Sequence, residues 1–334
     1  MTTALPDLTL RSVRVSPALF LAPMAGVTHA PFRRLVSDFG GHGALFTEML
    51  SARSLLHEDL HNSPFVKRRV QEGSVWYQLL LNGEEDLPAI IDRLKAIEPF
   101  ALDINLACPA PEILKRASGA ALFRDQERLA RVLSTVRHCW PGILSVKCRI
   151  GDNKPDWQET LARRLKAFEA HGIDAIFMHP RFFDEKLKRR ARWEALPWVT
   201  AQTSIPVIGN GDVLSVGDVA KSLTTAPGVR GIMLGRIAAV QPWIFATAAG
   251  KPPTVDYAEV WTRLLDYLHE DFASTKVLGR IKEFTAYYAR NFFFGHQLFA
   301  GVQSAETLDI ARIRAVEFLS RNPQTVITPT VAGV

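Results

Sequence analysis

The sequence has few of the features that define membrane, disulfide-bonded or metal-binding proteins. Its three cysteines, Cys108, Cys139 and Cys148, are too scattered for a disulfide framework or a zinc site. No apolar run reaches the roughly 18 residues that cross a bilayer, and residues 1–16 lack the apolar segment of a signal peptide. No cluster of His, Asp and Glu has metal-ligand spacing. We therefore expect a cytoplasmic protein with no membrane or metal partner. We also expect a monomer, although the sequence itself does not define the oligomeric state.

The charge balance is basic, with 40 Lys and Arg against 34 Asp and Glu. A net charge of +6 is weak evidence for a polyanionic partner, because many basic proteins bind no polyanion. Its distribution is more informative, since residues 251–334 carry equal numbers of cations and anions and residues 181–192 are strongly basic. The cations of this segment are Arg181, Lys186, Lys188, Arg189, Arg190 and Arg192. The cluster predicts a phosphate-contacting patch, and a solvated loop is the alternative.

Short apolar runs alternate with amphipathic stretches through most of the chain. The runs predict strands at Ala18–Ala22, Ala44–Thr47, Val75–Leu79, Ala101–Ile104, Ile143–Lys147, Ala175–Met178, Pro206–Ile208 and Gly231–Leu234. The stretches between them predict helices at Pro31–Phe39, Asp86–Ile97, Gln126–Cys139, Asp156–His171 and Val216–Leu223. Eight such units predict an α/β fold of the (β/α)8 TIM-barrel class. A doubly wound sheet is the alternative, but it normally opens with a Gly-rich turn, and none follows the first run.

The pattern changes after Trp243. A linker at Gly250–Thr254 is followed by helical periodicity alone, which predicts helices at Tyr257–Ala273, Gly279–Asn291 and Thr307–Ser320. We therefore predict a barrel domain over residues 1–248 and a helical bundle domain over residues 249–334. Within the bundle, Arg280, Lys282 and Arg290 could share a helix face, and an ordinary charged surface is the alternative.

All eight predicted strand ends carry residues that a binding or catalytic site could use. They are Pro23 and Met24, Glu48, Gln78, Asn105 with Cys108, Lys147 with Arg149, His179 with Arg181, Asn210-Gly211-Asp212, and Gly235-Arg236. Because active sites of this fold lie at the carboxyl ends of the strands, these residues predict one pocket at the barrel mouth.

Cys108 lies just past the strand that ends near Asn105, on a loop stiffened by Pro109 and Pro111. A lone cysteine is most often inert packing, but a packing cysteine normally sits inside an apolar run. A thiol with an ordinary pKa near 8.5 is mostly protonated at neutral pH, and no His adjoins it to form a thiolate. We therefore predict a general acid rather than a nucleophile.

The last two strands end in turns typical of phosphate sites, Asn210-Gly211-Asp212 and Gly235-Arg236. Gln78, Lys147 and His179 would face whatever such a phosphate anchors. An amide and a cation suit the edge of a flavin ring better than a metal. For each residue alone, an internal salt bridge or a core hydrogen bond is equally compatible.

Several segments resemble the tRNA-dihydrouridine synthases. They are Phe20–Arg33, Asp103–Pro109 with Gly119–Leu122, Ser145–Arg149, Pro206–Asp212, Gly231–Arg236 and Arg280–Lys282. The resemblance covers about residues 18–320, and the Asn-x-x-Cys-Pro segment together with the helical tail is its most specific part.

The resemblance implies an FMN-dependent barrel followed by a helical tRNA-binding domain. In that family NADPH (or NADH) reduces the flavin, hydride passes to C6 of a flipped-out uridine, and the loop cysteine, here Cys108, protonates C5. By position, FMN would be held by Pro23, Met24, Gln78, Lys147, His179, Asn210, Gly211, Asp212, Gly235 and Arg236. The substrate and tRNA side would include Asn105, Arg149, Arg181, Lys186, Lys188, Arg189, Arg190, Arg280 and Lys282.

The sequence departs from the family pattern at His29, Ala107 and Phe182, where Asp, Gly and Thr are frequent. These departures leave open which uridine position in tRNA is modified and to which subfamily the sequence belongs. A dihydroorotate-dehydrogenase-like enzyme is one alternative, but it leaves the helical tail and the basic segment unexplained. An RNA-binding protein on an inactive barrel is another, and it predicts loss of Cys108 or Lys147, both of which are present.

Overall fold

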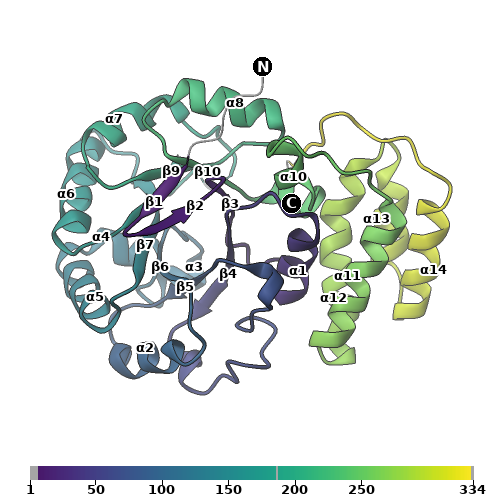
Figure 1. The fold of residues 1–334 in the computed structure, drawn as a ribbon, viewed down its shortest axis with the longest axis horizontal. Helices are drawn as coiled ribbons and strands as arrows, with labels where there is room; N and C mark the ends of the chain where they lie inside the picture. Colours follow the sequence, from purple (N-terminus) through teal and green to yellow (C-terminus); the bar gives the residue numbers. More distant parts are fainter. Residues whose placement is uncertain (1–6, 186, 332–334) are drawn as a thin grey trace.

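A closed barrel of eight parallel strands forms the centre of the computed structural model, which describes residues 7–185 and 187–331 (Figure 1). The strand order is β10-β3-β4-β5-β6-β7-β8-β9, so neighbours in sequence are neighbours in the barrel. The strands are β3 (Leu19–Leu21), β4 (Ala44–Ser51), β5 (Val75–Leu80), β6 (Ala101–Leu106), β7 (Ile143–Gly151), β8 (Ala175–Phe182), β9 (Val207–Asn210) and β10 (Gly231–Leu234). The predicted (β/α)8 barrel is confirmed.

The helices that follow the strands surround the barrel (Figure 1). They are α1 (Ala30–Phe39), α2 (Leu87–Lys95), α3 (Pro111–Leu114), α4 (Ala120–Arg124), α5 (Gln126–Cys139), α6 (Trp157–Ala170), α7 (Leu196–Ala201), α8 (Val216–Thr225), α9 (Arg236–Val240) and α10 (Ile244–Ala248). Short 3-10 turns are η1 (Arg53–Leu56), η2 (Val70–Glu72), η3 (Trp193–Ala195) and η4 (Ala289–Asn291). The loop predicted after Cys108 contains α3, because Pro111 occupies the first helical turn, where a missing N–H costs nothing.

A hairpin that the periodicity did not predict closes one end of the barrel. Its strands β1 (Leu8–Leu10) and β2 (Val13–Val15) are antiparallel, and their buried residues join the core inside the barrel. There Phe20, Trp76 and Phe177 pack edge to face, with ring centroids 5.0–6.2 Å apart. Aromatic side chains thus fill this end, and the opposite end holds the polar side chains that the next subsection describes.

The four long C-terminal helices pack beside the barrel at α1 (Figure 1). They are α11 (Tyr257–Asp271), α12 (Ser274–Tyr288), α13 (Gly295–Gln303) and α14 (Leu308–Leu319). Residues 249–256, between α10 and α11, contain neither helix nor strand. The division into domains at 248/249 stays a prediction.

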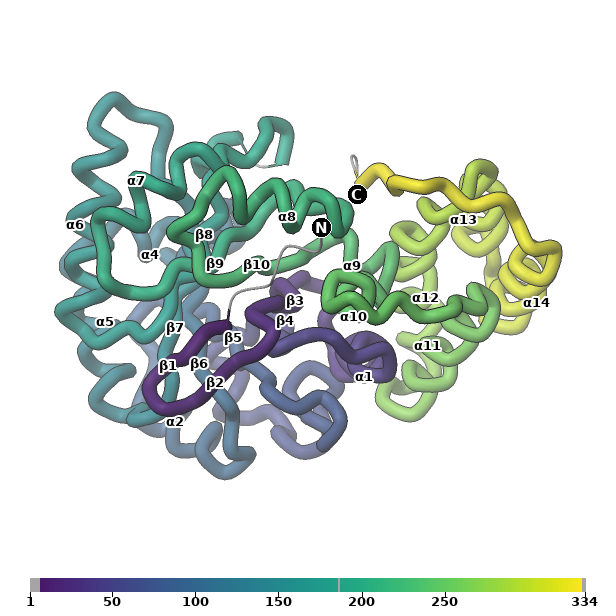
Figure 2. The backbone as a smooth tube through the Cα atoms, turned by 45° about the horizontal axis from the view of Figure 1, so that its top comes forward, coloured from purple at the N-terminus to yellow at the C-terminus, as the bar shows by residue number. Residues whose placement is uncertain are grey.

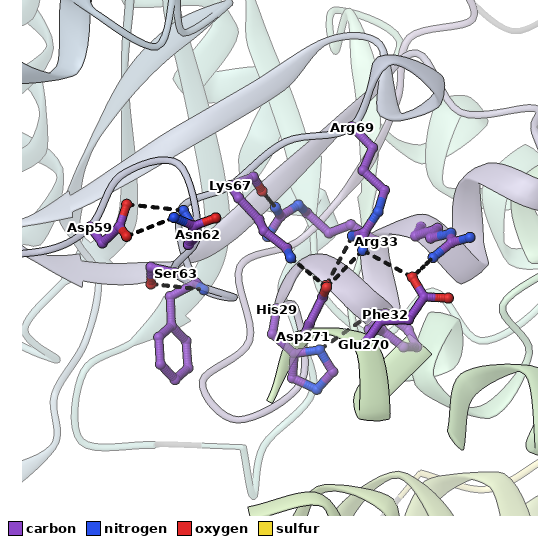
Figure 3. Close-up of polar contacts among 12 residues, drawn as sticks. His29, Phe32, Arg33, Asp59, Asn62, Ser63, Lys67, Arg69, Glu270 and Asp271 are labelled. Atoms are coloured by element: carbon purple, nitrogen blue, oxygen red, sulfur yellow. Dashed lines mark hydrogen bonds and ion pairs between the residues drawn. The ribbon is translucent and has the colours of Figure 1, made fainter. Parts of the chain in front are cut away.

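Charged residues join the end of α11 to the barrel (Figure 3). The Asp271 carboxylate, 1% exposed, accepts hydrogen bonds from Arg69 at 2.7 and 2.9 Å and pairs with Lys67. Its neighbour Glu270 pairs with Arg34 of α1 at 2.5 Å. The ring of His29 packs edge to face on Phe272. Ion pairs and ring contacts therefore fix the helical region against the barrel.

The chain then returns from the helical region toward the barrel (Figure 2). We call residues 323–331 the C-terminal strap. Its backbone hydrogen bonds join Gln324 to Phe293 and Val326 to Asn291, on either side of Phe292. Val331 is 3% exposed. The Arg236 guanidinium donates to the Val331 carbonyl at 2.8 Å. The strap thus ends beside the loop that follows β10.

Candidate active site

A cavity of about 200 Å³ lies at the carboxyl ends of the strands. Predicted cofactor residues from five strand ends line it together: Pro23, Met24, Lys147, His179, Asn210, Gly211, Asp212, Gly235 and Arg236. A larger cavity of about 870 Å³ shares Arg181, Asp212 and Arg236 with it and extends along the basic segment. The structure therefore brings these side chains into one region, as the barrel prediction required.

The turn after β9 allows a ligand to approach the backbone closely. Gly211 has φ +116°, and a Cβ there would lie 2.8 Å from the His179 ring, so a side chain has neither the conformation nor the space. The Asn210 amide donates to the Met233 carbonyl at 2.9 Å, which ties the end of β9 to β10. This turn can present backbone N–H groups to an anion next to a buried imidazole.

Arg181, predicted on the substrate and tRNA side, is buried in the wall that the two cavities share. It is 2% exposed, and its guanidinium donates to both Asp212 oxygens at 2.6 and 2.7 Å and contacts His179 Nε2 at 2.6 Å. Asp212 lies 3.8 Å from Arg236 as well. Arg181 is therefore inside the pocket wall, where the Asp212 carboxylate balances the charge of two arginines. Both residues line the cavities, and their assignments to the substrate and cofactor sides stay predictions.

Lys147 is a buried cation that needs an anion. It is 8% exposed, and no ion pair joins it to a carboxylate among the residues described. Burial and the nearby Arg149 lower the pKa of Lys147 to about 8. Burial, then Lys147 and Arg149, hold the pKa of His179 well below its usual value, so its imidazole is neutral. An electron-rich ring or a phosphate would relieve this excess of positive charge, so the lining fits a flavin nucleotide.

The Cys108 thiol lies at the same mouth, near Lys147 and Arg149. Its backbone N–H donates to Asn105 Oδ1 at 3.1 Å, and its carbonyl accepts from Ala120 N–H at 3.0 Å. Burial raises the pKa of the Cys108 thiol, and Glu112 raises it further. The thiol is therefore protonated at neutral pH, in agreement with a proton donor.

Asn105 and Gln78 are fully or nearly buried and contact each other. Asn105 Nδ2 donates to Gln78 Oε1 at 2.8 Å, and Asn105 Oδ1 accepts from the N–H groups of Ala107 and Cys108, each at 3.1 Å. The second N–H of Asn105 Nδ2 donates to Met49 Sδ, with 3.9 Å between nitrogen and sulfur, and this weak acceptor is the one that a stronger acceptor could replace.

Two carboxyl groups of the mouth were missed as site residues. Asp103 was grouped with an apolar run, yet it is fully buried and bonded to Gln78 and Ser145. Glu48 was noted at its strand end without a role. Its Oε2 accepts from Gly26 N–H at 2.8 Å, and its buried Oε1 has no partner among the residues described. A charged residue inside an otherwise apolar strand was the available signal for Asp103.

The basic segment divides into internal and exposed cations. Arg192 pairs with Glu185 at 2.5 Å. Lys188, Arg189 and Arg190 are exposed and line the larger cavity. Lys186 lies outside the described residues.

Arg280 and Lys282 both make contacts within the chain. The Arg280 guanidinium donates to the Gly26 carbonyl at 3.1 Å and lies 5.3–5.6 Å from the rings of Phe65 and Phe272. Lys282 donates to the Ala305 carbonyl at 2.6 Å. They do not share a helix face, since positions two apart point in different directions. Arg280 joins the helical region to the barrel, and its assignment to the tRNA side stays a prediction.

Barrel, cavity and protonated thiol together define a (β/α)8-barrel enzyme with its site at the carboxyl ends of the strands. The chain matches the family described as "Dihydrouridine synthase (Dus)" over residues 20–318. It therefore belongs to the dihydrouridine synthase family and is a flavin-dependent oxidoreductase.

Relatives of this family cover most of the chain. A "Probable tRNA-dihydrouridine synthase" of Rhodobacter capsulatus is 31% identical over 72% of this chain and 74% of its own length. One of the same name from Mycobacterium tuberculosis is 28% identical over 91% of this chain and 82% of its own. The "tRNA-dihydrouridine synthase B" of Pseudomonas putida is 32% identical over 68% and 66%, respectively.

Solved structures agree with the fold. The old yellow enzyme of Trypanosoma cruzi superposes with a TM-score of 0.55 at 10% identity, covering 80% of this chain and 98% of its own. Among residues 7–185 and 187–331, no helix is both long and apolar enough to cross a bilayer. The same residues contain no group of three or more His, Cys, Asp or Glu arranged to hold a metal.

Proposed function

We propose that the chain is a tRNA-dihydrouridine synthase, which reduces the C5–C6 double bond of uridines in tRNA. The observation that carries this proposal is the protonated Cys108 thiol, held beside buried Lys147 and Arg149 in a chain of this family. The names of the relatives supply the substrate class, and a cytoplasmic location follows from it.

A flavin nucleotide would lie along the smaller cavity. FMN, when bound and reduced by NADPH (or NADH), supplies the hydride that the C6 position of uracil accepts. Its phosphate would be held by the backbone of Asn210, Gly211 and Gly235 and by the Arg236 guanidinium. Gln78, Lys147 and His179 would contact the ring, and Pro23 and Met24 would cover it. Lys147, a buried cation of the cavity lining, would provide positive charge beside the ring.

Cys108 would donate the proton that C5 needs after hydride reaches C6. Its S–H bond breaks as the C5–H bond forms, and solvent later returns a proton to the thiolate. A raised pKa keeps the donor protonated before the reaction, and Lys147 and Arg149 stabilise the thiolate afterwards.

The uracil would lie between the flavin site and Cys108. Asn105 would donate its remaining N–H to a uracil carbonyl, and Arg149 would donate to the other. A uridine inside folded RNA must first leave its stack, and exposed cations can hold the backbone while it does so. Lys188, Arg189 and Arg190 are placed for such contacts, and we retain Lys186 with them.

The test is Cys108→Ala, with Cys139→Ala as the matched control on α5. We expect Cys108→Ala to keep its flavin and to be bleached by NADPH at the wild-type rate. Dihydrouridine formation in unmodified tRNA, measured by mass spectrometry of digested nucleosides, should fall at least 100-fold. The control should be unaffected. A wild-type protein that is colourless and refuses added FMN would overturn the proposal, as would a fully active Cys108→Ala.

A further inference from the structure

Asp103 is a carboxyl group inside the barrel to which the proposed reaction assigns no part. It lies on β6, directly between Ser145 of β7 and Gln78 of β5. Its Oδ1 is 2.6 Å from Ser145 Oγ, and its Oδ2 accepts from Gln78 Nε2 at 2.8 Å. A fully buried carboxyl is costly to keep, so a role beyond packing must be sought for it.

The hydrogen bonds that begin at Asp103 run in one direction to the catalytic loop. Gln78 Nε2 donates to Asp103, which turns Gln78 Oε1 toward Asn105, whose Nδ2 donates to it at 2.8 Å. This in turn points Asn105 Oδ1 at the N–H groups of Ala107 and Cys108. Turning either amide by 180° would bring two donors together at one of its ends and two acceptors together at the other. The acceptor oxygen of Asp103 at one end and the backbone N–H groups of Ala107 and Cys108 at the other therefore hold both amides in one orientation.

We propose that Asp103 is a positioning residue that orients the Gln78 and Asn105 amides and thereby seats the Cys108 loop. The role of that loop rests on the proposed function, whereas the orientation of the amides rests on the hydrogen bonds alone. Asp103 touches neither Cys108 nor the large cavity, so it acts through Gln78 and Asn105. The same chain of hydrogen bonds directs the second Asn105 N–H to Met49 Sδ at 3.9 Å, a weak acceptor that a uracil carbonyl could replace.

This orientation holds whether Asp103 is ionised or protonated. Burial raises the pKa of Asp103 to about 7, although Ser145, Gln78 and Lys147 oppose the shift. When ionised, it accepts from the Ser145 hydroxyl. When protonated, it donates to Ser145 Oγ, and that hydroxyl turns to the Leu102 carbonyl 3.5 Å away. Oδ2 accepts from Gln78 in both states. Asparagine reproduces the second arrangement, because its oxygen can face Gln78 while its nitrogen faces Ser145.

The experiment measures how fast iodoacetamide alkylates Cys108 in the flavin-containing protein, resolved by peptide mass spectrometry. Cys139, also partly exposed, is the internal control in every sample. We expect Asp103→Ala to raise the Cys108 rate at least tenfold by releasing its loop, and Asp103→Asn to stay within threefold of wild type. Neither variant should change the Cys139 rate. Dihydrouridine formation by the pre-reduced enzyme should fall tenfold or more in Asp103→Ala and little in Asp103→Asn.

Gln78→Met breaks the hydrogen-bond chain at its next link and keeps Asp103. We expect the same rise in the rate of Cys108 alkylation. Adding Asp103→Ala should cause no further rise, because both changes break the same chain of hydrogen bonds. Unchanged Cys108 alkylation in folded Asp103→Ala, or multiplying effects in the double variant, would overturn the proposal. If Asp103→Ala does not fold, an unchanged rate of Cys108 alkylation in Gln78→Met is by itself enough to overturn the proposal. Alkylation of Cys108 does not require catalysis. A wild-type protein that makes no dihydrouridine would therefore refute the proposed function without refuting the role of Asp103.

Discussion

Burial sets the protonation of the side chains at the barrel mouth. Buried acids, Asp103 and Cys108, have raised pKa values, and buried bases, Lys147 and His179, have lowered ones. In each case the low-polarity surroundings disfavour the charged form. The result is a neutral imidazole, a protonated thiol and a lysine that remains a cation at neutral pH.

Asp103 should make stability depend on pH. Its pKa of about 7 in the folded state exceeds the ordinary 3.8, so the folded protein binds more protons than the unfolded chain between these values. The free energy of unfolding should therefore fall as pH rises from about 4 to 7, by on the order of 1.4 kcal/mol per unit. We expect urea unfolding to show this loss for wild type relative to Asp103→Asn, which does not titrate. A difference between the two proteins that stays constant over this range would contradict the assignment.

His29 shows why some residues could be predicted and others not. The sequence marks it as a departure from the family, where Asp is frequent. In the structure its Nδ1 accepts from Phe32 N–H at 3.3 Å and caps α1, as an Asp side chain can do at the start of a helix. Site residues at strand ends were predictable because a barrel collects them at one mouth. The partners of Arg181 and Arg280 were not, because they come from distant positions, Asp212 and Phe65, that periodicity does not connect.

At the scale of elements, the loop from Cys108 to α4 depends on one glycine. Gly119 has φ +59°, and a Cβ there would lie 2.7 Å from the Cys108 carbonyl oxygen and 3.3 Å from its Cβ. Gly119→Ala should therefore displace Cys108 and slow uridine reduction at least tenfold, while flavin binding is kept. Gly73→Ala is the matched control, since its φ is +62° and its Cβ would meet nothing within 4 Å. Equal activity of the two variants would show that the displacement does not matter.

The end of α11 should contribute measurably to stability. Asp271 accepts from Arg69 and pairs with Lys67 at the junction shown in Figure 3. Burial opposes its ionisation, but these hydrogen bonds lower the pKa of Asp271 overall, so its contribution is present above about pH 4 and is lost as pH falls further. We expect Asp271→Asn to lower the free energy of unfolding at pH 7 by ~1–3 kcal/mol in urea titrations.

Glu259→Gln provides the control on the same helix. It removes an exposed pair with Arg263 four residues away and should cost only tenths of a kcal/mol. Equal losses in the two variants would mean that the junction contributes no more than a surface pair.

The periodicity of the sequence predicted the elements that are long enough to show a repeating apolar pattern, and it missed the shorter ones. All eight barrel strands and three of the C-terminal helices were predicted, because each has an apolar face long enough to show its period. β1 and β2 have three residues each, too few for a period of two to register. The strands β7 and β8 run on to Gly151 and Phe182, because their polar ends are buried in the mouth. Arg149 and His179 consequently lie on strands, which holds them more rigidly than loops would.

At the scale of the whole molecule, the C-terminal strap connects the helical region to the proposed phosphate site. It crosses from the helices to the barrel (Figure 2). It pairs with Phe292 on the way, and its Val331 carbonyl accepts from the Arg236 guanidinium. Arg236 thus receives an acceptor from a residue 95 positions away. Because α12 also contacts α9, the end of the barrel that would hold the cofactor phosphate is braced from the helical side twice.

This arrangement predicts that the strap slows the release of FMN. Val331→Lys places a cation beside Arg236 at a position 3% exposed, so it should lift the strap and free that guanidinium to move. We expect the flavin dissociation rate, followed by the recovery of free FMN fluorescence after dilution, to rise at least fivefold. Ile327→Lys adds the same charge to the same segment at a fully exposed position and should leave the rate unchanged. If both variants release FMN equally fast, the effect comes from charge alone, and the strap has no part in holding the phosphate end of the site.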